Sequence, residues 1–413
     1  MREIVDVIVV GAGQAGLAMS HVLRERCISH LVLERGRVGE HWRSQRWDSF
    51  RLLSPNWHTR LPGYHYRGRD PDGFMTGHEF ADLLVGYARH APVRTGVAVT
   101  AVRPHDGGWR VQTEDVELWS PAVVGATGDM HRPRIPWWAG DLDPGLPQLH
   151  SGRYRNADAL PDGPVLVVGA GPSGQQIALD LALAGRPVHL SVGGHRMLPR
   201  HYRGRDAFWW LDRLGLSART SYRSAGSAGL PPNPVLAAGR LDLHLPRLAD
   251  AGVRLHGRMH GARLGLRPAM TFADDVAASY ARALAGWRRF RSTADEYLRR
   301  HEVAAAPPDA DHPVLRWKPD AGETELALGD LGAVVWATGY RPDHRWLPTA
   351  VVGDDGRVIH DRGVTGLPGL YLLGLRWQHR QSSASIDGVG RDAEYLADRI
   401  GGQLTQVTRR LAS

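Results

Sequence analysis

Two stretches of this chain share one glycine-rich pattern, and no other sequence feature limits its fold as strongly. Residues 9–16 read VVGAGQAG and residues 167–174 read VVGAGPSG, each between a β-branched run and apolar residues at helical spacing. A glycine turn between a strand and a helix is typical of dinucleotide-binding folds, in which N–H groups at the helix start bind a pyrophosphate. The expected turn residues are Gly11, Gly13 and Gly16, and Gly169, Gly171, Ser173 and Gly174.

The spacing of the two turns predicts the domain organisation. Their first glycines lie 158 residues apart, which is about one domain's length, so each turn opens a separate fold. Buried-strand patterns return at residues 331–336 and 370–374, after a helical excursion at about 272–303. We predict an α/β protein with two Rossmann-like domains, the second inserted in the first. Residues 1–155 and 336–413 would form the first domain, and residues 156–335 the second.

Composition narrows the class of protein. Apolar residues make up 42% of the 413 residues, so the chain can bury a core. Cys27 is the single cysteine, which excludes a disulfide framework, a thiolate metal cluster and a two-cysteine redox pair. No run of 18 apolar residues predicts a membrane span, and the N-terminus lacks a signal-peptide layout. We expect a cytoplasmic protein.

The net charge of +8 raises the question of an acidic partner. Lys318 is the single lysine, so the other 50 basic residues are arginine, and they are scattered through every segment in runs of two at most. No nucleic-acid recognition motif accompanies them. We therefore predict no nucleic-acid binding and attribute the arginines to coding bias.

The ends of the second strands distinguish the two nucleotides. Glu34, with Arg35 after it, lies 23 residues beyond Gly11, where a carboxylate can bind a ribose diol and would repel a 2′-phosphate. The first site therefore suits FAD or NAD. Ser191 holds the matching position in the second fold, and Arg196 and Arg200 follow it. A hydroxyl and guanidinium groups suit the 2′-phosphate of NADP, although these arginines could equally be solvated loop residues. This pair of sites indicates electron transfer from NADPH to a flavin.

Further motifs accompany the two turns. They are GEHW at 39–42, RWDSFRL at 46–52, GATG at 125–128, WATGY at 336–340 and GVGRDA at 388–393. Together with the turns, they resemble the class B flavin-dependent monooxygenases, in particular the flavin-containing and YUCCA-like branch, over nearly the whole chain. The family fingerprint before the second turn is partial, because His150 and Tyr154 are kept while Pro144 and Leu146 replace its first half. Tyr154 in place of tryptophan points away from the Baeyer–Villiger branch.

The resemblance implies a reaction. NADPH would reduce FAD, and the reduced flavin would form a C4a-peroxyflavin with O2 that oxygenates a small molecule, most readily at nitrogen or sulfur. Oxidative decarboxylation or Baeyer–Villiger oxygenation by the same intermediate is an alternative. A flavin reductase or oxidase without oxygen insertion is another, and a regulator whose flavin senses NADPH is a third. A dimer is one option for the oligomeric state.

The resemblance also implies roles for individual residues. Asn56 is the nearest match to an asparagine that the family places near the flavin, although a plain turn role fits it equally. Trp42 would line the flavin pocket or serve as a core residue. Arg46 and Asp48 would support the flavin loop, and Gly128, Thr338 and Gly339 would lie where the two nucleotide sites join.

The loop after the strand at 370–374 is expected near the flavin, because binding residues collect at strand ends. His379 and Arg380 in this loop could face an acidic substrate group, flavin or solvent. The aromatic stretch from Tyr202 to Trp210 is expected to pack a helix against its neighbours. We identify no metal site.

Overall fold

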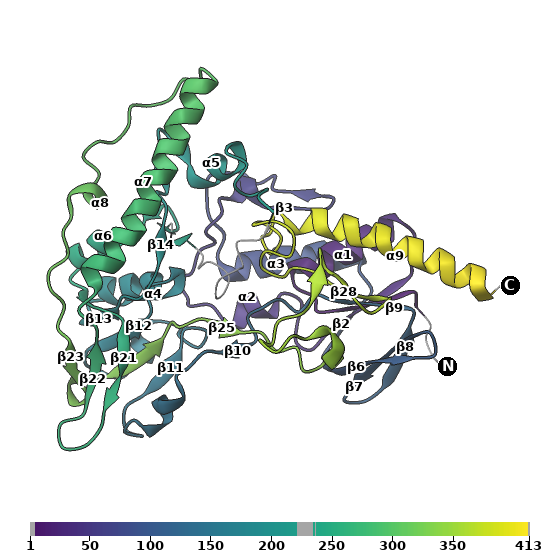
Figure 1. Ribbon diagram of the computed structural model, residues 1–413, viewed down its shortest axis with the longest axis horizontal. Helices are drawn as coiled ribbons and strands as arrows, with labels where there is room; N and C mark the ends of the chain where they lie inside the picture. Colours follow the sequence, from purple (N-terminus) through teal and green to yellow (C-terminus); the bar gives the residue numbers. More distant parts are fainter. Residues whose placement is uncertain (1–4, 221–233, 236, 412–413) are drawn as a thin grey trace.

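The computed structural model describes residues 5–220, 234–235 and 237–411, and it has two lobes, each built on its own parallel sheet (Figure 1). The first sheet has the strand order β26-β27-β28-β9-β1-β2-β5. Its five parallel strands are β1 (Val7–Val10), β2 (His30–Glu34), β5 (Val93–Thr95), β9 (Ala122–Gly125) and β28 (Leu370–Leu372). The antiparallel strands β26 (His360–Asp361) and β27 (Val364–Thr365) extend one edge.

Alternate residues of β1 enter two different cores, because successive side chains of a strand point to opposite faces. Val7 and Val9 pack against helices α1 (Gln14–Glu25), α3 (Gly77–Tyr87) and α9 (Val389–Leu411). Ile8 and Val10 pack against a three-stranded meander formed by β6 (Val99–His105), β7 (Gly108–Thr113) and β8 (Glu117–Ser120). Both faces of the sheet are thereby covered, as its continuous apolar strands require.

The second sheet repeats this arrangement and is wholly parallel in the order β11-β24-β12-β13-β20. Its strands are β11 (Gln148–His150), β24 (Ala333–Trp336), β12 (Val165–Val168), β13 (Val188–Ser191) and β20 (Arg254–His256). One face packs on α4 (Pro172–Leu183), α6 (Leu245–Asp250) and α7 (Val276–Arg300). The other packs on a second meander of β21 (Met259–Arg263), β22 (Ala269–Phe272) and β23 (Glu325–Ala327).

The chain order confirms the predicted fold class, since the second sheet is completed before β28 returns to the first. The domain boundaries differ in two details. Trp336, predicted to open the last part of the first domain, is the last residue of β24 in the second sheet. β11 precedes residue 155 but belongs to the second sheet, because it pairs with β24. A two-stranded ribbon of β10 (Arg132–Pro133) and β25 (Tyr340–Arg341) connects the lobes, since β10 follows β9 of the first sheet and β25 follows β24 of the second (Figure 1).

The predicted helical excursion is α7, which extends beyond the second sheet in Figure 1. Its buried residues, among them Tyr280, Trp287 and Phe290, recur every three or four positions, which is the stripe of an amphipathic helix. The far half of α7 packs on α5 (Ala207–Arg213) through Trp210, whose indole N–H donates to the Tyr202 carbonyl. The aromatic stretch therefore packs a helix.

Short elements complete the structure. The helical ones are α2 (Glu40–Ser44), α8 (Pro313–Arg316), η1 (Asn56–His58), η2 (Ala88–His90), η3 (Trp137–Asp141), η4 (Ala157–Ala159), η5 (Leu328–Asp330) and η6 (Thr349–Val351). The two-residue strands are β3 (Arg60–Leu61), β4 (Tyr64–His65), β14 (Arg196–Met197), β15 (His201–Tyr202), β16 (Arg205–Asp206), β17 (Pro234–Val235), β18 (Ala237–Ala238) and β19 (Leu241–Asp242). Among the described residues, none of the helices combines the length and apolar character needed to cross a bilayer.

Candidate cofactor and active site

The first glycine turn follows β1 and leads into α1, as predicted. Gly11 has φ +107°, and a Cβ on it would lie 2.7 Å from the Ala126 carbonyl oxygen after β9. A Cβ on Gly16 would lie 1.8 Å from the Gly11 carbonyl oxygen, so the helix approaches the turn too closely for any side chain. Gly13 is different, because open space surrounds its missing Cβ. Two glycines thus serve packing, and the middle one leaves room for a ligand.

The second turn reproduces this geometry closely. Gly169 has φ +109°, and its Cβ would lie 2.7 Å from the Ala337 carbonyl oxygen. A Cβ on Gly174 would lie 1.8 Å from the Gly169 carbonyl oxygen, and open space surrounds Gly171. The residues opposite the two turns belong to identical Ala-Thr-Gly triplets, 126–128 and 337–339. The two motifs that sequence reading treated separately are therefore equivalent parts of the two lobes.

Both helices begin without a side-chain cap. Gly13 and Gly171 are the N-cap residues of α1 and α4, and neither first turn contains an acidic residue. The N–H groups and positive dipole ends therefore face the open space beside these glycines, which is the chemistry that binds a phosphate. The cradles fit the pyrophosphates of two dinucleotides. Ser173 lies in the first turn of α4.

Glu34, at the end of β2, lies against the first turn. Its carboxylate accepts hydrogen bonds from the backbone N–H groups of Ala12, at 2.7 Å, and Gly36, at 2.9 Å. These bonds hold the acid at the mouth of the first cradle, where the ribose of a bound dinucleotide would lie. Arg35 is exposed beside it.

The three residues predicted at the end of β13 and beyond it lie in different surroundings. Ser191 is buried, and its hydroxyl donates to the Gly257 carbonyl and accepts from the Met259 N–H. Arg200 is fully buried, with its guanidinium bound to the Leu53 carbonyl and to Asp206. Arg196 is exposed on β14. Of these three side chains, Arg196 is the one that can reach a ligand as the structure stands.

Sequence reading missed Arg258. It follows β20, the neighbour of β13, and its Nη2 lies 3.6 Å from the Cβ position of Gly194 in the loop after β13. Parallel strands end at one edge of a sheet, so an exposed arginine after β20 can meet a ligand that lies over β13. No local pattern marks this residue, because the β13–β20 pairing that positions it spans more than 60 residues.

Trp42 on α2 joins the first turn to the aromatic core beside it. Its indole N–H donates to Oε1 of Gln14 at 3.3 Å, and its ring meets Phe80 edge-on at 5.0 Å. The Arg46 guanidinium lies 4.9 Å from the Trp42 ring centre. Desolvation lowers the pKa of Arg46 to about 10, and among the described residues its guanidinium donates to the Gln45 carbonyl, at 2.8 Å, and pairs with no carboxylate. Its charge is therefore available to an anionic group bound near the turn.

His41 lies beside this arginine and is held neutral. Burial, followed by the positive charges of Arg46 and Arg35, lowers the pKa of His41 to about 3. Its ring lies 6.3 Å from that of Tyr340 on β25. Sequence reading did not identify these two residues as neighbours, although each lies within a quoted motif.

Asn56 in η1 has both parts of its amide occupied. Its Nδ2 donates to the Asp70 carbonyl, and its Oδ1 accepts from the Met75 N–H at 3.1 Å. This arrangement braces the 56–75 loop, and a contact of Asn56 with flavin stays a prediction. Asp48 accepts a hydrogen bond from Asn156 Nδ2 at 2.6 Å, which ties the segment after α2 to the start of the inserted domain.

The Ala-Thr-Gly triplets form the junction between the lobes. Gly128 and Gly339 have φ +75° and +83°, and open space surrounds both. The Thr338 hydroxyl donates to the Arg134 carbonyl, and the Gly339 carbonyl accepts from Arg134 N–H at 2.9 Å. The pairing of β10 with β25 thereby joins the ends of β9 and β24, which lie next to the two glycine turns.

The loop after β28 is braced by a serine. The N–H groups of His379 and Arg380 both donate to Ser383 Oγ, at 3.1 and 2.9 Å, and Arg380 forms a β-bridge with Thr220. Both side chains are half-buried. The loop therefore contacts the inserted domain, and a contact of these two residues with substrate stays a prediction.

Comparison with known proteins identifies the family. The family model described as pyridine nucleotide-disulphide oxidoreductase matches residues 8–206. The CzcO-like oxidoreductase of Geobacillus kaustophilus, which is uncharacterized, is 34% identical over 407 residues, covering 97% of this chain and 99% of that protein. The chain belongs to the CzcO-like oxidoreductases. The indole-3-pyruvate monooxygenase YUCCA6 of Arabidopsis thaliana is 27% identical over 95% of this chain and 89% of its own length.

These relationships confirm the resemblance to flavin-dependent monooxygenases and the prediction of an oxidoreductase, and they support FAD and NADPH as its cofactors. Solved structures show the same fold. The flavin-containing monooxygenase of Stenotrophomonas maltophilia matches at 22% identity and a TM-score of 0.62, over 97% of this chain and 99% of that one. The bacillithiol disulfide reductase of Bacillus cereus matches at 16% identity and a TM-score of 0.62, over 97% and 100%.

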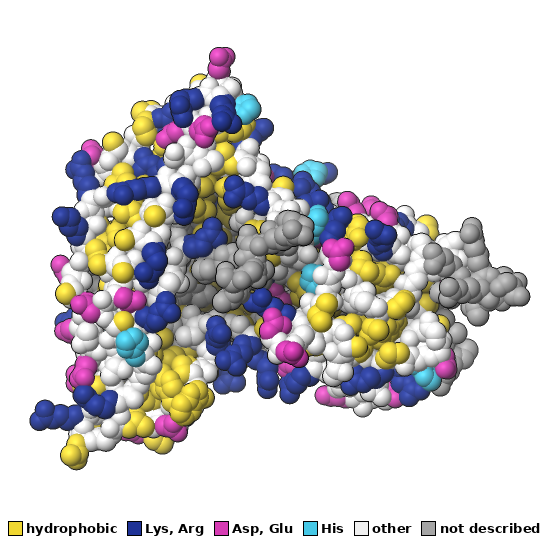
Figure 2. Space-filling model, viewed as in Figure 1, with side chains coloured by type: hydrophobic (Ala, Val, Ile, Leu, Met, Phe, Trp, Pro, Cys, Tyr) yellow, Lys and Arg dark blue, Asp and Glu magenta, His cyan; other side chains and the backbone are white. Residues whose placement is uncertain are grey.

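The CzcO-like chain contains one cysteine, Cys27, which is exposed just after α1. It therefore lacks the cysteine pair that a two-cysteine redox centre needs. Its arginines are spread over both lobes on the face shown in Figure 2 and form no single basic surface there.

Proposed function

We propose that this CzcO-like oxidoreductase is an NADPH-dependent FAD monooxygenase that uses O2 to oxygenate a small molecule, at nitrogen or sulfur, by means of an oxygenated flavin. One observation carries the proposal. Two uncapped glycine cradles lie at the carboxyl ends of two parallel sheets, and the β10–β25 ribbon joins those ends. The lone cysteine suits a cytoplasmic enzyme.

The residues of each cradle support one cofactor. FAD fits the first cradle, because the Glu34 carboxylate can accept from a ribose diol and would repel a 2′-phosphate. NADPH fits the second, because β13 ends without an acid and Arg196 and Arg258 stand exposed beyond it. When bound, NADPH supplies hydride and FAD supplies the group that accepts it and activates oxygen.

The chain itself has to position the two cofactors and exclude water. Its helix N-termini bind the pyrophosphates, and the uncompensated charge of Arg46 beside Trp42 favours an anionic group near the first turn. In this proposal, the junction at Thr338 and Gly339 and the braced loop at 379–383 would shield the cofactors from water; the Thr338 bond to the Arg134 carbonyl and the Arg380 bond to Ser383 support this role. Few acid–base side chains are needed, because the redox chemistry belongs to the cofactors.

The YUCCA relationship favours a second candidate, oxidation of a 2-oxo acid with loss of its carboxyl group. YUCCA6 is an indole-3-pyruvate monooxygenase, and the similarity extends over 95% of this chain. His379 and Arg380 would then face the substrate carboxylate.

The reduced holoenzyme mixed with O2 and NADP+ in a stopped-flow spectrometer tests the proposal. Monooxygenation requires the absorption band of a C4a-oxygenated flavin that lasts for seconds, followed by oxygenated product when substrate is added. Direct return to oxidised flavin with one hydrogen peroxide per NADPH would overturn the proposal in favour of an oxidase. Panels of amines, thioethers, ketones and 2-oxo acids are then scored by product and NADPH consumption. They distinguish oxygenation at nitrogen or sulfur from Baeyer–Villiger oxygenation of a ketone and from oxidative decarboxylation of a 2-oxo acid.

A further inference from the structure

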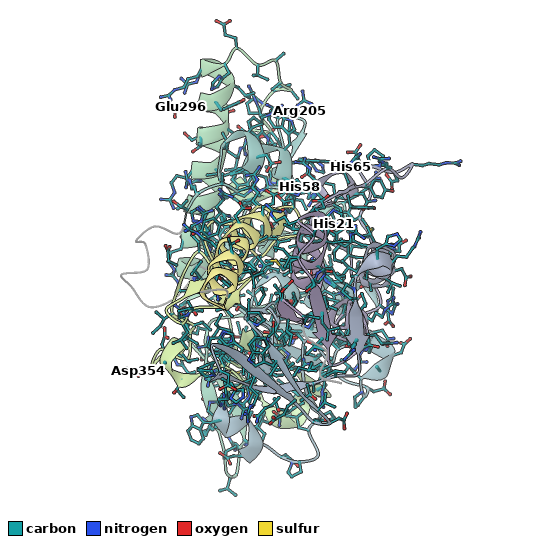
Figure 3. All side chains as sticks on the ribbon, turned by 90° about the vertical axis from the view of Figure 1, so that its right-hand side faces the viewer. His21, His58, His65, Arg205, Glu296 and Asp354 are labelled. Carbon is teal, nitrogen blue, oxygen red and sulfur yellow. The ribbon has the colours of Figure 1, made fainter. Side chains whose placement is uncertain are left out.

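Three segments far apart in the chain bring a histidine and two carboxylates together. His58 belongs to η1, Asp212 to α5, and Asp387 to the loop just before α9. The Nε2 atom of His58 lies 3.4 Å from Oδ2 of Asp212 and 3.5 Å from Oδ2 of Asp387. Figure 3 labels His58 near the start of the yellow helix α9, beside the purple N-terminal part of the chain (Figure 3).

The buried histidine nitrogen is left without a partner. The His58 side chain is 2% exposed, and its Nε2 atom makes no hydrogen bond within the part of the chain that the structure describes. The two carboxylate oxygens are too distant for a normal N–H···O bond, whose length is about 2.7–3.2 Å. Burying a polar nitrogen without a hydrogen-bond partner costs free energy. A bound ion between His58 and the two carboxylates would remove this cost.

The surrounding side chains fix the three groups in this orientation. The Ser385 hydroxyl donates to Oδ1 of Asp387 at 2.7 Å, and the Ser217 hydroxyl donates to Oδ1 of Asp212 at 3.3 Å. Each carboxylate therefore uses one oxygen for a serine and directs the other toward His58. The His58 ring packs near Phe208 and Trp57, with ring centres 4.9 and 5.2 Å away. Outer hydrogen bonds and packing of this kind orient the ligands of metal sites.

The spacing matches the edge of a coordination tetrahedron. With metal–ligand bonds of about 2.0–2.1 Å, ligand atoms at tetrahedral angles are separated by about 3.3–3.4 Å. The two separations from His58 Nε2 are 3.4 and 3.5 Å, and all three ligand atoms lie within 4.8 Å of one another. We propose that His58 Nε2, Asp212 Oδ2 and Asp387 Oδ2 bind one divalent transition-metal cation of the Zn2+ type. Two carboxylates and a neutral imidazole would balance its charge, and water would fill the fourth position beside Asp212, whose side chain is 35% exposed.

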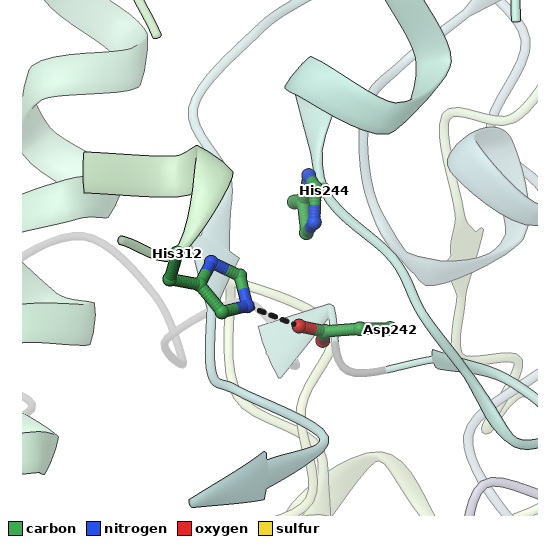
Figure 4. A group of neighbouring side chains, drawn as sticks. All are labelled: Asp242, His244 and His312. Carbon is green, nitrogen blue, oxygen red and sulfur yellow. Dashed lines mark hydrogen bonds and ion pairs between the residues drawn. The ribbon is translucent and has the colours of Figure 1, made fainter. Parts of the chain in front are cut away.

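A second cluster of the same residue types shows why composition alone does not make such a site. Asp242, His244 and His312 also lie close together (Figure 4). The Nδ1 atom of each histidine accepts a hydrogen bond from a helix N–H, of Arg247 and of Val314. Each Nε2 therefore carries a hydrogen, and that of His312 donates to Asp242 at 3.0 Å. A protonated Nε2 cannot ligate a cation, so this cluster serves as the control.

The proposed cation would compete with one neighbouring charge. Arg60 Nη1 lies 3.9 Å from Asp212 Oδ2, and its side chain is 51% exposed, so it can turn to solvent. A bound cation would then link η1 of the first lobe to α5 of the inserted domain and to the start of α9. The same region contains the loop at 379–383, which contacts Ser217 and Arg219 through backbone hydrogen bonds.

Zinc titration of the full-length, untagged holoenzyme after EDTA treatment tests the proposal. We expect one Zn2+ per chain, by metal analysis after gel filtration and by competition with a chromophoric chelator, and a rise in the unfolding temperature that Mg2+ does not give. Asp387→Asn and His58→Gln should each weaken Zn2+ binding at least 10-fold, and Ser385→Ala should weaken it less. Asp242→Asn should bind Zn2+ like the unmodified chain.

Three outcomes would overturn the site. The first is the absence of saturable 1:1 binding of Zn2+ to the unmodified chain. The others are Zn2+ binding by Asp387→Asn as tight as that of the unmodified chain, and a loss of binding in Asp242→Asn as large as that in Asp387→Asn. Circular dichroism and flavin absorbance show whether each variant is folded. If Asp387→Asn does not fold, Ser385→Ala and the titration of the unmodified chain still decide, because neither removes a ligand. The assay measures metal directly, so it stands whether or not the enzyme proves to be a monooxygenase.

Discussion

Residues of one type serve different purposes here, and their surroundings decide which. Arg196, Arg200 and Arg258 all lie beyond the carboxyl edge of the second sheet or near it. Arg200 is fully buried in contacts to Leu53 and Asp206, whereas Arg196 and Arg258 keep exposed guanidinium groups. Selectivity for a phosphorylated nicotinamide should therefore depend on the two exposed arginines.

Replacing either of these exposed arginines should change the Michaelis constant for NADPH and leave that for NADH nearly unchanged. We expect Arg196→Ala and Arg258→Ala each to raise the Michaelis constant for NADPH about 10-fold or more, because each removes a charge-assisted bond of about 1.5–3 kcal/mol to the 2′-phosphate. The constant for NADH should stay nearly unchanged. Steady-state oxidation of both coenzymes measures this, with the exposed Arg267→Ala as control. An equal rise for both coenzymes would remove the assignment.

His189 predicts a pH dependence of stability. Burial first, and the neighbouring His256 second, lower the pKa of His189 to about 4. Between about pH 6.5 and pH 4 the unfolded chain therefore binds a proton that the folded chain does not. The contribution of His189 to stability should be complete above pH 6.5 and should fall by up to about 1.4 kcal/mol per pH unit below it, in addition to the contributions of other buried histidines such as His41. Urea unfolding at pH 7.5, 6 and 5 should show a smaller loss of stability on acidification in His189→Gln than in the unmodified chain; an equal loss in both would contradict the prediction.

At the scale of elements, each lobe uses one strand–turn–helix unit and one Ala-Thr-Gly triplet in the same way. The triplet follows the strand adjacent to the turn, and its alanine carbonyl oxygen lies 2.7 Å from where a Cβ on the first glycine would be. The third glycine permits contact between helix and turn, and the middle one faces open space. The glycines of one motif should thus differ sharply in what their substitution costs.

Gly171→Ala and Gly174→Ala form a matched pair. The Cβ in Gly174→Ala would lie 1.8 Å from a backbone oxygen, so we expect a loss of about 3 kcal/mol or more in unfolding free energy, or no folded protein. Gly171→Ala should fold with near-normal stability, because its φ of −72° suits alanine, and should weaken NADPH binding by blocking the cradle. Urea unfolding and coenzyme titration measure the two effects. Equal destabilisation by both would show that the middle glycine also serves packing.

At the scale of the whole molecule, side chains between the lobes hold the cradles in place. Arg200 binds a carbonyl of the first lobe and a carboxylate of the inserted domain, and its guanidinium stacks 4.4 Å from the Phe74 ring centre. Arg200 is 0% exposed, so its charge is fully buried at this contact. Its removal leaves Asp206 without its buried partner.

Arg200→Ala should therefore destabilise the protein by about 3–5 kcal/mol, and lysine should not replace it, because one ammonium cannot make both bonds. Thermal unfolding and limited proteolysis at the lobe junction measure the effect. Arg205→Ala provides the control, since Arg205 is exposed over Trp209. A melting temperature equal to that of the control would refute this role.

Much of the architecture could be predicted because its signals are local. The glycine turns, the strands beside them, Glu34 and the α7 excursion each depend on a few consecutive residues whose spacing reflects backbone geometry. Contacts between segments far apart in the sequence could not be predicted. Nothing near Arg258 shows that β20 lies beside β13, and nothing near Arg200 shows that it will be buried.

The sequence by itself determined that this chain builds two nucleotide-binding folds, one nested in the other, and its strand-end residues predict a different nucleotide for each. Only the tertiary structure decided which arginines stay exposed, that the two Ala-Thr-Gly triplets are equivalent, and that His58 meets Asp212 and Asp387. The physical reason is that periodicity and turn chemistry are properties of neighbouring residues. Side-chain encounters across 150 residues or more depend on how whole sheets and helices pack.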